Sequence, residues 1–338
     1  MKRPAIAILC ALCAWGAPAS ADAPEHPLDL DREDVRAFVA GASERHGLDP
    51  AFLERGLAAA RVQPRIIEAI SRPAEKVKPW HEYRKIFLTE ERIAAGAAFW
   101  TEHREILDGV AAQTGVPAHI IAGIIGVETY YGRITGRWRV LDALATLAFE
   151  YPPRAGFFGK ELEAFFLLAQ EQGLDPAGPT GSYAGAMGLA QFIPTSYRAY
   201  AADGDGDGRV DLWGSVPDAV ASVANYLAVH GWRAGEPVAA PLVAPAAVLD
   251  GFADPGLTPL ARRAALWSAG IGVAGPAPAR PDAAAGVFVL DGEAGPLYWA
   301  GFDNFYVITR YNRSLMYALA VTQLGEAVRD RVMADDAG

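Results

Sequence analysis

Cysteine is almost absent from this chain of 338 residues, and the two that occur, Cys10 and Cys13, lie close to the amino terminus. Beyond them no disulfide bond can form, so packing or a bound metal must hold the fold. The six histidines lack the paired H-x-x-x-H spacing of a zinc site, and no glycine-rich phosphate loop is present. The sequence therefore predicts no zinc, no nucleotide and no organic cofactor.

Basic residues are also fewer than acidic ones. The chain has 30 Lys and Arg and 40 Asp and Glu, which gives a formal charge of −10. A chain this acidic has no electrostatic reason to bind DNA or RNA, so a nucleic-acid partner is not expected. The hydrophobic fraction of 51% argues against disorder, and no short repeat is visible. A folded globular protein is predicted.

Long apolar runs are missing too. The longest early one, at residues 6–15, is too short to span a bilayer. Lys2 and Arg3 precede it and Ala19-Ser20-Ala21 follows, which is typical of a secretory signal peptide cut after Ala21. An uncleaved anchor is the alternative. We expect an exported protein that is not integral to a membrane, with no lipoprotein cleavage motif around either cysteine.

The apolar pattern predicts a mainly α (α+β) chain. Strands are expected at 287–290 and 298–299, with a third at 305–309. The stretch 236–286 carries an apolar run at 238–243 and a helix at 258–269, or else is a loosely ordered linker. Helices are predicted, in chain order, within 31–75 and at 89–114, 116–132, 141–150, 158–173, 194–201, 217–230 and 313–330.

A carboxylate ends the most apolar of these helices. The run AHIIAGIIGV at 118–127 leads into Glu128, and Gly132 is expected to supply the left-handed residue at the helix end. The helix C-terminus and an apolar surrounding both disfavour ionised Glu128, which predicts a raised pKa. A protonated acid of this kind suits general-acid chemistry on a glycosidic oxygen. The alternative is a Glu128 that reaches solvent or pairs with Arg133 or Arg137.

The segment DGDGDGRVD at 203–211 has the spacing of a calcium loop. Carboxylates occupy its positions 1, 3, 5 and 9, and Gly208 stands at position 6, where an EF-hand loop turns sharply. Four like charges this close repel one another unless a cation joins them. Position 12 is Gly214 instead of Glu, so the nearest candidate for the missing carboxylate is Asp218, at the start of the next helix.

A structural Ca2+ is the predicted cofactor, because one loop and four Met in the chain do not fit a paired calcium sensor. A solvated acidic turn is the alternative. The expected metal ligands are Asp203, Asp205, Asp207, Arg209, Asp211 and Asp218.

Several motifs together resemble one enzyme family, the B-type lytic murein transglycosylases, which are periplasmic enzymes with a lysozyme-like fold. The resemblance extends over nearly the whole chain after residue 21. The motifs are WHEYRKIF at 80–87, GVETYYG at 126–132, LDALATLAFEYPPRA at 141–155, GSYAGAMGLAQFIPTSY at 181–197, DGDGDGRVDLW at 203–213, SVANYLAVHGW at 222–232 and NFYVITRYN at 304–312.

The resemblance implies cleavage of the β-1,4 bond between N-acetylmuramic acid and N-acetylglucosamine in peptidoglycan, leaving a 1,6-anhydromuramoyl end. Glu128 matches the family's single catalytic acid and base. It would protonate the leaving oxygen and then take the proton of the sugar's own C6 hydroxyl, which attacks C1. Two alternatives are a muramidase that uses water and a non-catalytic peptidoglycan-binding protein with structural calcium.

The same resemblance implies the substrate contacts. Ser182 and Gln191 match polar residues near the cleavage point. Aromatic groove positions and the RYN motif supply the rest, although each aromatic taken alone fits a core residue as well. These further candidates are Tyr83, Phe157, Phe192, Tyr226, Tyr311 and Asn312.

Domain boundaries follow from the resemblance and the composition. After the signal peptide at 1–21 we expect an N-terminal helical region at 22–115 and a small β-containing subdomain at 236–299. The lysozyme-like core would comprise 116–235 and 300–332, with the calcium loop at 203–218. The partners expected are peptidoglycan glycan strands and other cell-wall enzymes, and the chain is expected to be a monomer.

Overall fold

The structure is a computed structural model that describes residues 24–71, 78–254, 256–259 and 261–337. The predicted signal peptide, Cys10 and Cys13 lie outside these residues. The described chain forms two compact units, one of residues 78–131 and 220–337 (unit 1) and one of residues 24–71 and 132–219 (unit 2). Each unit combines part of the predicted N-terminal region with part of the predicted core, and the predicted domain boundaries stay predictions.

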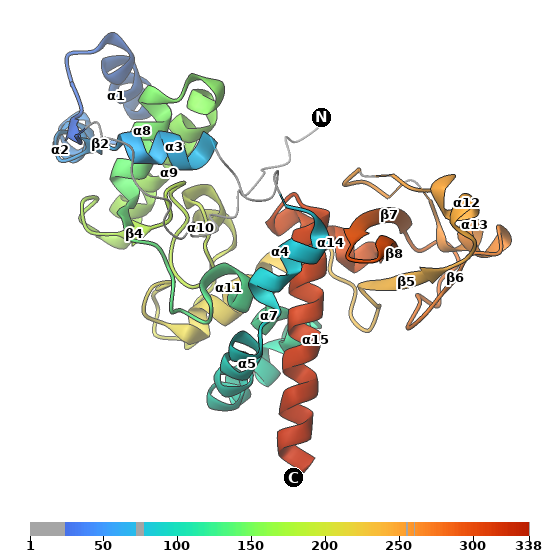
Figure 1. The fold of residues 1–338 in the computed structure, drawn as a ribbon. Helices are drawn as coiled ribbons and strands as arrows, with labels where there is room; N and C mark the ends of the chain where they lie inside the picture. The colour runs from blue at the N-terminus through green and yellow to red at the C-terminus, as the bar shows by residue number, and fades with distance from the viewer. Residues whose placement is uncertain (1–23, 72–77, 255, 260, 338) are drawn as a thin grey trace. The chain divides into compact units, whose positions relative to one another are not determined.

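Unit 1 contains helices and the larger sheet (Figure 1). Its helices are α4 (Trp80–Phe87), α5 (Glu90–Glu102), α6 (Arg104–Thr114), α7 (Ala118–Thr129), most of α11 (Val216–Val229), α12 (Ala246–Asp250), α13 (Arg263–Ser268), α14 (Asp303–Tyr311) and α15 (Leu315–Ala337). Its strands are β5 (Ala239–Val243), β6 (Gly272–Val273), β7 (Ala285–Gly292) and β8 (Gly295–Phe302).

Unit 2 is built around helices and two short two-stranded sheets, β1–β2 and β3–β4. Its elements are β1 (His26–Pro27), α1 (Glu33–His46), α2 (Pro50–Ala58), β2 (Arg61–Val62), α3 (Pro64–Ser71), β3 (Trp138–Arg139), α8 (Val140–Glu150), the 3-10 turn η2 (Pro152–Arg154), α9 (Ala155–Gln172), β4 (Thr180–Gly181), α10 (Pro194–Tyr200) and the start of α11.

Most predicted elements are confirmed, and three expectations are wrong. The helix expected over 89–114 is two helices that break at His103. The strand expected at 305–309 is helix α14, whose first turn carries Asp303 at the favourable N-terminal end. The linker alternative for 236–286 also fails, since this stretch contains β5, β6, α12 and α13.

The sheet of unit 1 is antiparallel, in the order β6-β5-β8-β7. Strands β7 and β8 form a hairpin whose register runs from Ala285 opposite Phe302 to Gly292 opposite Gly295. One face packs on α12 and α13 around Leu249, Leu266, Ala300 and Phe302. On the other face the rings of Phe288 and Phe305 stack at 4.9 Å, which brings α14 against the sheet.

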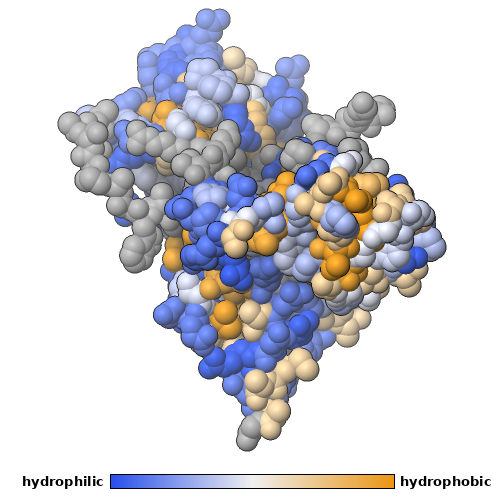
Figure 2. All heavy atoms as spheres, turned by 45° about the vertical axis from the view of Figure 1, so that its right-hand side comes forward, coloured by the Kyte–Doolittle hydropathy of each residue, from blue (hydrophilic) through white to orange (hydrophobic). Residues whose placement is uncertain are grey.

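Part of the surface near this sheet is apolar. Hydrophobic side chains gather toward the right of Figure 2, the part of the molecule that carries β5 to β8 in Figure 1. Leu297 on β8 and Val243 on β5 are 42% and 58% exposed. Leu297 also lines a hollow of about 360 Å³ with Leu242 and Trp299.

The core of unit 1 depends on close contact between α7 and α15. Gly123 of α7 faces the backbone of α15, because a β-carbon there would lie 2.5 Å from the carbonyl oxygen of Val321. Gly325 of α15 in turn lies against the backbone of His119. Ten of the twelve residues of α7 are buried, so the two helices meet through backbone and small side chains.

Replacing Gly123 tests this packing. We expect Gly123→Ala to lower the free energy of unfolding by about 1–3 kcal/mol, because the added methyl group overfills the contact with Val321. Gly109→Ala is the matched control on α6, where a β-carbon meets nothing within 4 Å. It should be neutral or stabilising by roughly 0.5–1 kcal/mol. Urea unfolding of both variants checks the prediction, and equal effects would contradict it.

Candidate functional site

Glu128 is the penultimate residue of helix α7 and is partly exposed at the end of an otherwise buried helix. The hydroxyl of Tyr317, on α15, donates a hydrogen bond of 2.7 Å to its Oε1 atom. Tyr317 is itself wholly buried. One carboxyl oxygen is therefore fixed by a rigid donor from the neighbouring helix.

The chain leaves α7 through an unusual turn. Tyr130 and Tyr131 have φ values of 52° and 56°, in the left-handed region that non-glycine residues rarely adopt. Each costs roughly 1–2 kcal/mol. The expectation that Gly132 supplies the left-handed residue at the helix end is wrong, because Tyr130 already does so. The backbone N–H of Tyr130 donates to the carbonyl of Gly126, and that of Tyr131 donates to the carbonyl of Ile125.

The side chain of Tyr131 is packed tightly enough to hold this strained turn. Its ring lies 5.4 Å from the ring of Phe99. Its hydroxyl lies so close to Gly96 and Gly126 that a β-carbon at either position would collide with it. The hydroxyl is buried and has no hydrogen-bond partner among the described residues. Burial raises the pKa of Tyr131 well above its usual range.

Unit 2 contains buried carboxylates that have structural partners. Burial raises the pKa of Glu161 to about 7, a value that by itself could suggest a catalytic acid. However, its two oxygens accept hydrogen bonds from the backbone N–H and the hydroxyl of Thr195, and the residue is only 2% exposed. Asp142 is likewise held by Arg139 and by the backbone N–H of Arg61. The hydrogen bonds of Glu161 and Asp142 therefore stabilise the fold of unit 2.

The predicted polar contacts Ser182 and Gln191 lie in the loop after β4, in unit 2. The Ser182 hydroxyl accepts hydrogen bonds from the backbone N–H groups of Ala184 and Ala186. Gln191 has a φ of 49°, and its side-chain amide donates to the carbonyls of Thr135 and Gly188. Both side chains therefore organise the loop around them.

The predicted groove aromatics differ in exposure. Tyr83, Phe192 and Tyr311 are wholly buried, and Tyr226 is 3% exposed. Of these five aromatic residues, only Phe157 is partly exposed. The guanidinium carbon of Arg154 lies 4.3 Å from the centre of its ring.

The motifs at 222–232 and 304–312 contact each other in unit 1. The Tyr226 hydroxyl donates to the carbonyl of Arg310 at 2.6 Å, and its ring lies 4.9 Å from that of Tyr311. Asn312 is buried at the end of α14.

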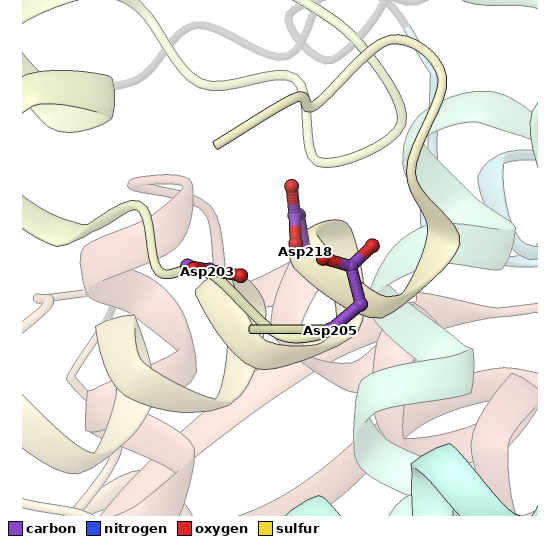
Figure 3. A group of neighbouring side chains, drawn as sticks. All are labelled: Asp203, Asp205 and Asp218. Carbon is purple, nitrogen blue, oxygen red and sulfur yellow. The ribbon is translucent and has the colours of Figure 1, made fainter. Parts of the chain in front are cut away.

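The acidic loop brings three of the six predicted metal ligands together (Figure 3). Oxygen atoms of Asp203, Asp205 and Asp218 all lie within 4.8 Å of one another. Asp218 is 1% exposed, and it accepts hydrogen bonds from the backbone N–H groups of Gly204 and Asp211. These oxygens are the hard donors that calcium prefers.

The rest of the loop is shaped by turns. Gly206 and Gly208 have φ values of 76° and 85°, which allow the chain to fold back on Asp203. Asp207 accepts from the backbone N–H of Arg209, and Asp211 from that of Trp213. The other three predicted ligands are therefore outside the close cluster of carboxylates. They are Asp207, Arg209 and Asp211.

Tyr317 is the functional candidate that the sequence did not reveal. It belongs to no motif and falls inside the predicted helix at 313–330, as one aromatic in an apolar helix face. Only the packing of α15 on α7 brings its hydroxyl to Glu128.

None of the described helices is both long and apolar enough to cross a membrane. The pair α6 and α7 meets the length and composition together, but it is bent by 117°.

Comparisons with known proteins agree over most of the chain. Residues 31–326 match the family described as transglycosylase SLT domain. The membrane-bound lytic murein transglycosylase B of Escherichia coli is 41% identical over 307 residues, which cover 87% of this chain and 82% of that protein.

Solved structures of lytic transglycosylases are also similar to this chain. The lytic transglycosylase SltB1 of Pseudomonas aeruginosa, solved in a catenated form, is 46% identical with a TM-score of 0.84, covering 89% of this chain and 98% of that one. The Escherichia coli lytic transglycosylase SLT35, solved in complex with calcium, is 39% identical with a TM-score of 0.80, covering 90% and 95%.

The buried hydroxyl of Tyr131 yields a stability prediction. We expect Tyr131→Phe to leave the free energy of unfolding unchanged or to raise it by about 1 kcal/mol, because it removes a buried polar group that has no partner. Thermal unfolding measures the effect. A loss of more than about 1 kcal/mol would show that the hydroxyl has a partner that stabilises the turn.

Proposed function

The chain belongs to the transglycosylase SLT domain family and is a peptidoglycan lytic transglycosylase with a lysozyme-like fold, and we propose that Glu128 is its single catalytic acid and base. Such enzymes cleave the β-1,4 bond between N-acetylmuramic acid and N-acetylglucosamine and form 1,6-anhydromuramoyl ends. The observation that carries the proposal is the hydrogen bond from Tyr317 to the carboxyl group of Glu128 at the end of a buried helix.

The chemistry needs one carboxyl group in two protonation states. Glu128 first donates its proton to the glycosidic oxygen as the bond from C1 to that oxygen breaks. The resulting carboxylate then accepts the proton of the C6 hydroxyl of the same muramic acid, whose oxygen bonds to C1. The first proton stays on the leaving sugar, Glu128 is protonated again by the proton from C6, and the anhydro ring closes without consuming water. This reaction does not need the second carboxylate that ordinary glycosidases use.

Tyr317 supports this role because it hydrogen-bonds one of the two carboxyl oxygens of Glu128. Its hydroxyl donates to Oε1 whether or not the group is protonated. The exchanging proton is therefore directed to the other oxygen, Oε2. Because Tyr317 is wholly buried on α15, it also restricts the rotamer of Glu128.

Substrate contacts are proposed for the residues whose motifs match the family. Ser182 and Gln191 would contact sugars near the cleaved bond. Phe157 offers a partly exposed ring for an apolar sugar face. Tyr83, Phe192, Tyr226, Tyr311 and Asn312 complete the proposed set. Because these five side chains are buried, their proposed role is to support the residues around them.

Replacing the proposed acid is the direct test. Glu128→Gln keeps the side-chain shape and an oxygen that can accept from Tyr317, but it has no proton to exchange. We expect turnover of purified sacculi to fall by at least about 100-fold. Binding to sacculi and the melting temperature should stay close to those of the wild type. Turnover at the wild-type rate would overturn the assignment.

We also propose a structural Ca2+ in the loop at 203–218, with Asp203, Asp205 and Asp218 as its central ligands. Three observations support it: their clustered oxygens, the left-handed glycines of the loop, and the calcium complex of the relative SLT35. The other predicted ligands, Asp207, Arg209 and Asp211, would complete the shell. A bound cation would tie the loop to the first turn of α11, where Asp218 lies.

Calcium removal tests this site. Ca2+ at about a hundredfold excess over its dissociation constant should stabilise the fold by roughly 2.7 kcal/mol, and excess chelator should remove this effect. Asp205→Asn should abolish the calcium response, while Asp175→Asn, in an exposed turn outside the cluster, should retain it. An identical melting curve for the wild type with calcium and with chelator would contradict the proposal.

The proposed place of action is the periplasm, where the peptidoglycan substrate lies. The likeness of this chain to a lytic murein transglycosylase of Escherichia coli supports this placement. Glycan strands of peptidoglycan are the proposed binding partner.

A further inference from the structure

Arg92 occupies an unfavourable place on its own helix. It lies in the first turn of α5, where the backbone N–H of Arg92 donates to the Thr89 hydroxyl that caps the helix. A cation at a helix N-terminus is repelled by the positive end of the helix dipole. The side chain is also partly buried, and this burial lowers the pKa of Arg92. Contacts outside α5 must therefore hold the guanidinium in place.

Among the described residues, those contacts are with the end of α7 and with nearby aromatic rings. The Nη1 atom donates a hydrogen bond of 2.6 Å to the carbonyl oxygen of Gly126. The guanidinium carbon lies 4.3 Å from the ring centre of Tyr130 and 5.4 Å from that of Phe87. Within the part of the chain that the structure describes, no carboxylate forms an ion pair with Arg92.

The Gly126 carbonyl is one of the last four of α7, which lack a regular partner in their own helix. It accepts the backbone N–H of Tyr130 at 3.2 Å as well as the guanidinium of Arg92. A cation here also offsets the negative end of the α7 dipole. Arg92 thus bonds the residue two before Glu128 and stacks on the residue two after it.

We propose that Arg92 is a positioning residue that clamps the last turn of α7 through Gly126 and Tyr130, and so fixes the direction in which Glu128 presents its carboxyl group. The inference rests on the proposed catalytic role of Glu128. Without Arg92, Tyr130 would lose one of the contacts that hold its strained left-handed conformation. Relaxation of that turn would rotate the end of α7 and displace Glu128 from the bond it protonates.

The chemistry of the side chain matters to this role. A guanidinium is planar, so it can stack on the Tyr130 ring while an edge N–H bonds the Gly126 carbonyl. A lysine ammonium supplies the charge and one hydrogen bond but has no flat face. A methionine fills a similar volume and supplies neither charge nor donor.

The experiment compares Arg92→Met and Arg92→Lys in the full chain, with kcat and KM measured on soluble glycan strands prepared from sacculi. We expect Arg92→Met to lower kcat by about ten- to a hundred-fold, since a misplaced catalytic group costs this much. KM should remain within about twofold, because Arg92 is proposed to position the acid and not to bind substrate. Arg92→Lys should recover part of the lost kcat.

Arg331→Met is the matched control. Arg331 ties α15 to the same first turn of α5 by an exposed ion pair with Glu90, and within the described residues its ion pairs and hydrogen bonds are with Glu90 and Asp335, not with the end of α7. Its kcat and KM should equal those of the wild type.

Three outcomes would overturn the inference: a wild-type kcat in Arg92→Met, a rise in KM that accounts for the whole loss, or a loss in Arg92→Lys equal to that in Arg92→Met. If Arg92→Met does not fold, Arg92→Lys decides alone. A lowered kcat at unchanged KM and melting temperature supports the clamp, and a wild-type kcat rejects it. Glu128→Gln separates the two proposals, because an inactive Glu128→Gln beside an unaffected Arg92→Met rejects only the clamp.

Discussion

The hydrogen bond between the Tyr317 hydroxyl and Glu128 Oε1 is the contact on which the rest of the account depends. The two helices approach each other closely at Gly123 and Gly325, where the absence of a β-carbon leaves room for the opposite backbone. The same apolar packing that stabilises unit 1 therefore sets the environment of the carboxyl group. Stability and the proposed chemistry depend on the same helix pair, so changes in this packing are expected to affect both.

The structure around Glu128 fits a reaction in which the substrate supplies its own nucleophile. A single carboxyl group must lose and regain one proton without changing position, which requires a rigid support. A wholly buried tyrosine, a helix in which ten of twelve residues are buried and a turn with two left-handed tyrosines provide that rigidity. The strain of the turn is an energetic cost, and the packing of Tyr131 against two glycines helps to hold it.

Much of this could be predicted from the sequence, because local pattern determines it. Apolar periodicity located most helices, the β7–β8 strands and the position of Glu128 at a helix end. The strand expected at 305–309 failed because Val307 and Ile308 favour strands locally, while the packing of Phe305 on Phe288 favours helix α14. The proposed roles of Tyr317 and Arg92 were not predictable, since each depends on a contact between different helices.

The end products released from peptidoglycan test the central claim most directly. The wild-type protein should digest purified sacculi in water enriched in heavy oxygen, and mass spectrometry should identify the new muramic acid ends. The account predicts 1,6-anhydromuramoyl ends that are one water lighter than reducing ends and carry no label. Labelled reducing ends would contradict it, because they would show that water, and not the C6 hydroxyl, attacks C1.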